Sequence, residues 1–141
     1  MNLFFEKINE FKQGLFVYSD PGGAKPILSL ASLVREQYKH VELIVITDRE
    51  YDFSSQFTEV KIVEDIDQWL DGVSQFDFVF TGTSYTSDIE KRVLQWAIKK
   101  KLITFSFVDH WTNLKERFEF GGSYVFPDNI LVIDEKAKSM A

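Results

Sequence analysis

Runs of apolar residues alternate along this chain with stretches in which apolar residues recur every three or four positions. The runs 43–46 and 78–80 contain no polar residue, which is typical of parallel strands buried on both faces of a sheet. The apolar runs predict strands, and the stretches with helical spacing predict helices. We expect strands at 15–19, 41–47, 60–63, 76–81, 103–108 and 130–133, and helices at 24–38, 65–73 and 87–101.

The alternation of strands with helices predicts an α/β fold, a three-layer α/β/α, Rossmann-like parallel sheet of about six strands in a single domain. Right-handed crossovers place the loops that follow the strands at one edge, where sheets of this kind bind ligands. Phe4, Ile8 and Phe11 recur at helical spacing and predict an amphipathic helix over 2–13. We therefore expect an N-terminal helix within 1–13, packed on the domain or a partner, and a Rossmann-like domain over 14–141.

The segment 113–128 is the longest part of the chain without clear periodicity. It is rich in aromatic residues around Gly121 and Gly122, and it is either an irregular loop or a short hairpin. Asp77 is the one charge in the predicted strand 76–81, and we expect it at the solvated strand end. The pattern turns helical again over 135–141.

The composition is that of a globular domain with many large aromatic side chains. Among 141 residues there are 14 Phe, 5 Tyr and 3 Trp, which need a deep core or an interface. The formal net charge of -6 argues against a nucleic-acid partner, and the lysines at 99–101 are interpreted as a solvated helix end. The chain has no cysteine, which excludes a disulfide, a thiolate metal site and a cysteine nucleophile.

The sequence also indicates a cytoplasmic protein. No window approaches the roughly 18 apolar residues of a membrane span, and Glu6 and Glu10 stand where a signal peptide would be apolar. We expect no transmembrane segment, and the residues indicate no cofactor and no metal site.

Three loops after predicted strands carry candidate chemistry, and the first is Asp20-Pro21-Gly22-Gly23. Its glycines would let a phosphate or carboxylate approach the free N–H groups of the following helix, which Pro26 would help to start. The alternative is a tight turn in which Asp20 only caps the helix. The loop matches neither the dinucleotide fingerprint nor a P-loop. Asp48, at the position of a ribose-binding acid, is therefore not assigned that role.

The second loop follows the strand at 76–81 and opens a helix. Ser87 and Glu90 fit a capping box, which accounts for both residues. Gly82, Thr83, Ser84 and Tyr85 are not needed for capping, and we interpret them as candidate contacts to an anionic or sugar-like ligand.

The third loop is Asp109-His110-Trp111, directly after the strand at 103–108. His110 could act as a general base towards a hydroxyl, with Asp109 orienting it or pairing with Arg117. The alternative is a structural histidine, because no G-x-S-x-G elbow completes a triad. His40, at a helix-strand junction, is not a candidate.

A series of motifs in the C-terminal third resembles a known family. The series is Asp109-His110-Trp111, Asn113, Arg117-Phe118 and Phe126-Pro127-Asp128. It resembles the N-terminal Rossmann-like domain of bacterial polysaccharide-biosynthesis proteins in the GT-B glycosyltransferase and UDP-N-acetylglucosamine 2-epimerase superfamily. The resemblance covers most of residues 14–141. The loops at 20–23 and 82–84 fit the first and fourth strand loops of such domains.

The resemblance implies an acceptor-side domain that faces a second Rossmann-like domain, or a partner chain, across a cleft. The second domain would hold the nucleotide-sugar donor, so this chain would not be active alone. The family pattern would place Asp20, Gly22 and Gly23 at the cleft floor and 82–85 on its wall. His110 would stand at a sugar or polysaccharide acceptor, flanked by the candidate ligand contacts Asp109, Trp111 and Arg117.

Two other functions remain open. A non-catalytic module could use its aromatic 111–126 segment to dock another protein, whereas a phospho-receiver-like domain fits badly because its acid cluster is missing. The enzyme hypothesis expects Asp20, Ser84 and His110 within about 15 Å of one another, since one small ligand must touch them all. A sheet that normally meets a second domain would also expose apolar surface and favour homo-oligomers.

Overall fold

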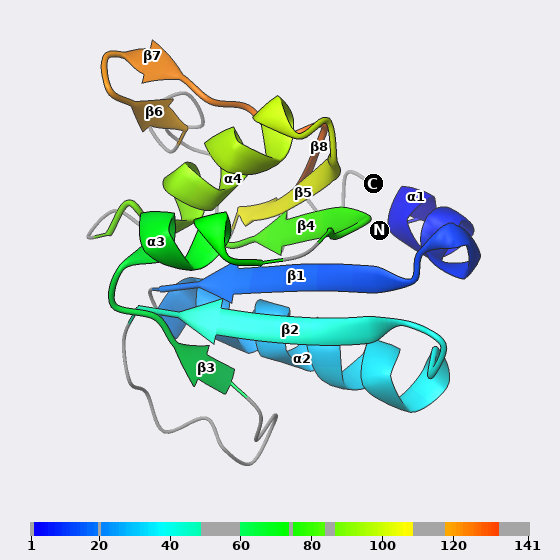
Figure 1. The fold of residues 1–141 in the computed structure, drawn as a ribbon. Coiled ribbons are helices and arrows are strands. Elements are labelled where there is room, and N and C mark those ends of the chain that lie inside the picture. The colour runs from blue at the N-terminus through cyan, green and yellow to red at the C-terminus, as the bar shows by residue number, and fades with distance from the viewer. Residues whose placement is uncertain are drawn as a thin grey trace.

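The computed structural model describes residues 2–19, 21–48, 60–73, 75–83, 87–108 and 118–132. It confirms the α/β fold with one six-stranded, fully parallel sheet (Figure 1). The strands are β1 (Gln13–Tyr18), β2 (Glu42–Thr47), β3 (Val60–Ile62), β4 (Phe78–Thr81), β5 (Ile103–Val108) and β8 (Asn129–Val132). Their order across the sheet is β3-β2-β1-β4-β5-β8, the order of a Rossmann-like fold.

Helices cover both faces of the sheet. The first is α1 (Asn2–Lys7), which continues into the 3-10 turn η1 (Ile8–Glu10), and the others are α2 (Pro21–Gln37), α3 (Ile66–Asp71) and α4 (Ile89–Lys99). The side chains of α1 and α2 share one core with the sheet, and those of α3 and α4 share a second core on the opposite face. This is the predicted three-layer arrangement. No helix in the described ranges is long and apolar enough to cross a membrane.

Most of the aromatic residues that the structure describes pack in hydrophobic cores rather than on a surface. Among the described residues nine phenylalanines are buried: Phe4, Phe11, Phe16, Phe76, Phe78, Phe80, Phe105, Phe107 and Phe118. Phe4 of α1 is fully buried, and its ring centroid lies 5.2 Å from that of Phe78 and 5.2 Å from that of Phe105. The short N-terminal helix therefore closes the first core over the middle of the sheet.

The segment after β5 ends in a hairpin. Strands β6 (Glu119–Phe120) and β7 (Ser123–Tyr124) pair antiparallel across Gly121 and Gly122, whose φ angles are 62° and 80°. Two consecutive positive φ angles define the tight turn that favours glycine at both positions. Of the two interpretations of this segment the hairpin is confirmed, and its base packs Phe118 and Val125 on Leu94 of α4.

Several predicted boundaries were wrong. The helix expected at 24–38 begins at Pro21, because proline at the first helical position needs no N–H partner and already has a helical φ. Pro26 lies inside this helix rather than at its start. The helix expected over 2–13 ends earlier, with the 3-10 turn that closes at Glu10. Asp77 accepts the backbone N–H groups of Lys12 and Gln13, at 2.6 and 3.0 Å, and β1 begins at Gln13. The helix expected at 135–141 lies outside the described residues.

Candidate functional site

The candidate site lies at the carboxyl ends of β1, β2 and β4. The chain leaves β1 towards β2 on one side, whereas it leaves β4 towards β5 on the other side. The gap between β1 and β4 is thus the switch point of the sheet, where open α/β sheets bind ligands. The first residues after these strands are Ser19, Asp48 and Gly82.

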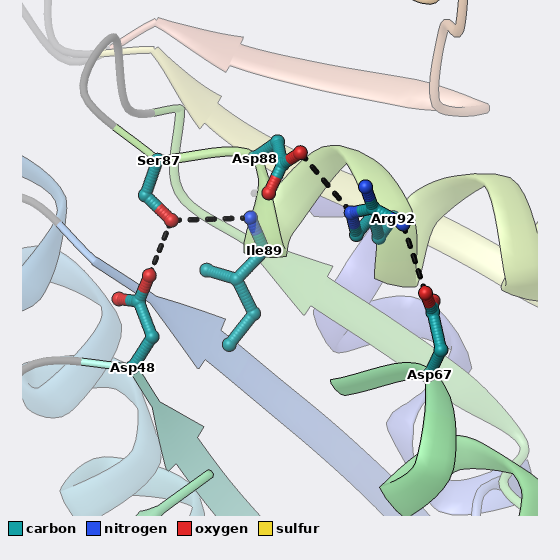
Figure 2. Close-up of polar contacts among 6 residues, drawn as sticks. All are labelled: Asp48, Asp67, Ser87, Asp88, Ile89 and Arg92. Carbon is teal, nitrogen blue, oxygen red and sulfur yellow. Dashed lines mark hydrogen bonds and ion pairs between the residues drawn. The ribbon is translucent and has the colours of Figure 1, made fainter. Parts of the chain in front are cut away.

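Asp48 joins three elements at this point. The hydroxyl of Ser19 donates to Oδ1 of Asp48 at 2.7 Å. The hydroxyl of Ser87 donates to Oδ2 of the same carboxylate, as Figure 2 shows. The oxygen of Ser87 also accepts the backbone N–H of Ile89, at 3.2 Å, in the first turn of α4. One carboxylate therefore ties the end of β1 and the start of α4 to the end of β2.

The capping box predicted for Ser87 and Glu90 does not have the expected form. Helix α4 begins at Ile89, and its N-cap residue is Asp88, which makes no side-chain cap bond. Ser87 stands one position too early and binds the N–H two residues on, a local turn that serine hydroxyls often make. The hydroxyl of Ser87 also donates a hydrogen bond to Asp48, a partner that local spacing could not reveal. Glu90 is 2% exposed, in the first turn of α4.

The start of α4 is also fixed from its outer side. Arg92 donates from Nη1 to Asp67 of α3 at 2.8 Å and from Nε to Asp88 at 3.1 Å (Figure 2). The hydrogen bond and charge of Asp88, reinforced by Asp67, raise the pKa of Arg92 above its ordinary value. These contacts hold α3 and α4 together next to the switch point.

The glycine-containing loop does not exist as a separate loop. Pro21, Gly22 and Gly23 form the first turn of α2. The expectation of a free loop ahead of the helix was therefore wrong. Proline suits the first helical position, so the helix already begins at Pro21. The two glycines still belong to the helix end that follows β1, so they remain near the carboxyl edge of the sheet.

Gly82 and Thr83 extend the end of β4. The backbone N–H of Gly82 donates to the carbonyl of Val17 at 3.0 Å, and the hydroxyl of Thr83 donates to the carbonyl of Phe107 at 3.1 Å. Gly82 thus continues the pairing with β1, and Thr83 links β4 to β5. The hydroxyl of Thr83, which the sequence suggested as a ligand contact, has a structural partner.

Other polar side chains in the sheet hold the strands together. The hydroxyls of Thr81 and Ser106 are buried and lie 2.6 Å apart. Asp128 accepts the backbone N–H and the hydroxyl of Thr104 at its Oδ2, at 3.0 and 3.1 Å. Asp128 therefore has a structural role, the joining of β8 to β5.

Seven predicted site residues lie outside the described residues, and their contacts stay predictions: Asp20, Ser84, Tyr85, Asp109, His110, Trp111 and Arg117. The expected convergence of Asp20, Ser84 and His110 falls among them. In the part of the chain that the structure describes, no three acidic or histidine side chains are grouped as a metal site would require.

Sequence reasoning missed the partnership of Ser19 and Ser87 with Asp48. A signal was present, because Ser19 and Asp48 are the first residues after two adjacent strands. No family model, no curated protein and no solved structure matches this chain.

Proposed function

We propose that this chain is the acceptor-side Rossmann-like domain of a sugar-transferring protein of polysaccharide biosynthesis. It would bind a hydroxyl-rich ligand at the carboxyl edge of the sheet. The observation that carries this proposal is the meeting of Ser19, Asp48 and Ser87 at the switch point between β1 and β4. The motif series in the sequence supports the choice of a sugar ligand.

The chemistry of this cluster suits a sugar hydroxyl. An ionised carboxylate offers about four acceptor positions, so Asp48 can accept a ligand hydroxyl in addition to those of Ser19 and Ser87. A hydrogen bond to a charged acceptor is stronger than one between neutral groups. The serines hold the Asp48 carboxylate in one orientation, which lowers the entropic cost of binding.

The proposal includes a second domain. The resemblance assigns the nucleotide-sugar to a C-terminal or partner domain, and this chain would then bind an acceptor but turn over no substrate by itself. We accordingly expect affinity for saccharides and little affinity for nucleotides.

A thermal-shift and calorimetric titration tests this function. The ligands are N-acetylglucosamine, short oligosaccharides containing it, UDP and UDP-N-acetylglucosamine. A ligand at ten times its Kd stabilises the folded chain by about 1.4 kcal/mol, or about 5 °C in Tm. We expect such a shift with saccharides and not with UDP. If no saccharide raises the Tm, the acceptor-side proposal fails.

A pair of aspartate variants provides the control. Asp48→Asn should abolish the shift caused by a saccharide, measured against the Tm of the unliganded variant. Asp77→Asn is the matched control, because Asp77 also accepts two hydrogen bonds, but at the amino edge of the sheet. Equal loss of binding in both variants would mean that the carboxyl edge is not the binding site.

A second candidate function is a protein-interaction module that uses the hairpin. Tyr124 is 54% exposed and Phe126 is 46% exposed, and their rings stack with centroids 5.7 Å apart. Phe126 also contacts the buried ring of Phe118, so the exposed pair is held on the domain. A folded chain that no sugar or nucleotide stabilises would favour this function.

A further inference from the structure

A groove lies between α3 and α4 at the amino edge of the sheet. Its volume is about 550 Å³, and its lining comes from the end of α3, the link to β4 and the end of α4. We call it the α3–α4 groove, and its main lining residues are Leu70, Asp71, Phe76, Trp96, Lys100 and Leu102. The groove forms because the two helices differ in length: α3 is only about 9 Å long and α4 is about 16 Å long. The short helix leaves the last turn of α4 uncovered on that side.

The groove has an apolar, aromatic floor. Leu70 and Phe76 are each 5% exposed, so they present a firmly packed surface. The indole of Trp96 is half-buried and meets the ring of Phe76 edge-on, with centroids 6.4 Å apart and planes at 74°. Aromatic side chains arranged in this way can take a third ring by stacking or by an edge contact.

The rim of the groove carries opposite charges on its two sides. Asp71 ends α3, and Lys100 follows the last turn of α4; both side chains are exposed. A smaller hollow of about 170 Å³ shares Leu70, Asp71 and Trp96 and continues towards Arg92. At that far end the charges of the two helices pair directly, because Arg92 binds Asp67. The groove thus has an acidic wall on α3 and a basic wall on α4.

We propose that the α3–α4 groove binds a small aromatic zwitterion, a molecule with one flat ring, one ammonium group and one carboxylate. The ring contacts Trp96 and Phe76, the ammonium faces Asp71, and the carboxylate faces Lys100. A volume of about 550 Å³ lies within the range of small-molecule sites, roughly 300 to 1,000 Å³. An acyl chain or an apolar helix fits less well, because it would cover Asp71 and Lys100 without pairing their charges.

This binding is independent of the proposed function. The groove is built by residues that precede β4 and β5, whereas the Asp48 cluster follows β1 and β2. The two sites therefore lie at opposite edges of the sheet. Asp48→Asn should leave binding at the groove unchanged, so each proposal can fail without the other.

A titration followed by ¹H–¹⁵N NMR on the full chain tests the proposal. The probes are L-tryptophan, indole-3-acetate, tryptamine and indole, which separate the contributions of the ring, the carboxylate and the ammonium. We expect tryptophan to bind with the lowest Kd and to shift the amide signals of 70–76 and 96–102. Shifts confined to another region, or the absence of shifts at 10 mM tryptophan, roughly the weak limit of specific binding, would overturn the proposal.

Two charge variants sharpen this test. Lys100→Gln should raise the Kd of tryptophan and of indole-3-acetate about two- to fivefold, the range of exposed ion pairs, and leave the Kd of tryptamine unchanged. Asp71→Asn should raise the Kd of tryptophan and of tryptamine and leave the Kd of indole-3-acetate unchanged. Lys39→Gln is the control, because Lys39 is an exposed lysine in the turn after α2. Equal effects of both variants on all four probes would contradict the assignment of the two charges.

The aromatic contact is tested at Trp96. Trp96→Phe keeps a ring in the groove, so its affinity for tryptophan should stay within about fivefold of the wild type. The affinity of Trp96→Ala should fall more than about tenfold, on the scale of an aromatic contact. Each variant is used only if its ¹H–¹⁵N spectrum retains the dispersion of the wild type. Stronger binding of decanoate than of tryptophan would identify an acyl-chain site and overturn the zwitterion proposal.

Discussion

Gly14 lies where the backbone of β1 runs directly beside the aromatic core. A Cβ atom at this position would lie 2.1 Å from Cζ of Phe78, which is far inside van der Waals contact. Phe78 has no exposed surface, and the ring of Phe11 lies 4.7 Å from it, between centroids. The ring therefore has little room to move away, and the position requires a residue without a side chain.

Gly14→Ala should accordingly destabilise the protein. Overpacking of a filled core costs about 1 to 3 kcal/mol, and urea denaturation would measure that loss in the free energy of unfolding. Gly72→Ala is the matched control, because a Cβ at Gly72 would only meet the carbonyl oxygen of Trp69 at 3.7 Å. The close-approach argument predicts a clear difference between the two variants, and equal stabilities would refute it.

Lys101 adopts a left-handed backbone conformation, with φ of 61°, at the end of α4. Its N–H donates to the carbonyl of Ile98, and the N–H of Leu102 donates to the carbonyl of Ala97, each at 3.0 Å. This pair of bonds is a Schellman motif, in which glycine usually takes the left-handed position. The lysines at 99–101 thus do form a helix end, as the sequence predicted.

Lys101→Gly should stabilise the chain. Relief of the left-handed strain is partly offset by the greater freedom of glycine in the unfolded state, which leaves a gain of about 0.5 to 1 kcal/mol. Lys100→Gly should have the opposite sign, because Lys100 has a helical φ of -84° and needs no glycine. Thermal unfolding of both variants measures the difference, and a loss of stability in Lys101→Gly would contradict the assignment.

At the scale of elements, α1 does more than the sequence indicated. It was predicted as an amphipathic helix that packs on the domain or on a partner, and its apolar face is buried in the domain itself. Phe4 meets rings of β4 and β5, and the ring of His40 bonds to the carbonyl of Ile8 at 3.1 Å. The helix is therefore an integral part of the first core.

Phe4→Ala should lower the free energy of unfolding by about 3 to 5 kcal/mol, the usual effect of truncating a buried phenylalanine. Phe5→Ala, on the same helix, should cost about 1 kcal/mol, because Phe5 is only partly buried and packs on Tyr38. Guanidinium unfolding of the two variants tests this ranking. A Phe4→Ala variant as stable as Phe5→Ala would show that α1 is not part of the folding core.

At the scale of the whole molecule, the strand order determines which parts are most protected. The central strands β1 and β4 are flanked on both sides and covered by helices on both faces. Strands β3 and β8 lie at the edges of the sheet, and β3 has only three residues. The stability of the sheet is thus expected to fall from its centre towards β3 and β8.

Native-state hydrogen exchange measures this gradient. Amides of β1 and β4 should exchange only through global unfolding, with protection near the full free energy of unfolding. Amides of β3 should exchange at least about tenfold faster, since local opening at an edge breaks fewer contacts. Equal protection of β3 and β1 would imply that a further segment covers the β3 edge.

The amino-acid sequence alone determined the fold class, the number of strands in the parallel sheet and their positions to within two residues. The strand predicted at 103–108 is found unchanged, and the turn at Gly121 and Gly122 is the one that two adjacent glycines favour. These features depend on neighbouring residues, because helix and strand periodicity and turn geometry act over a few positions. They can therefore be predicted without knowledge of the tertiary structure.

Only the tertiary structure decided how the candidate site is built. Asp48 bonds to Ser19 and Ser87, which are 29 and 39 positions away, and these bonds exist only because β2 lies beside β1 and α4 begins near both. The same holds for the α3–α4 groove, which depends on the unequal lengths of two helices that pack together. Alternating strands and helices are compatible with several strand orders, so local pattern cannot choose among them, whereas long-range packing does.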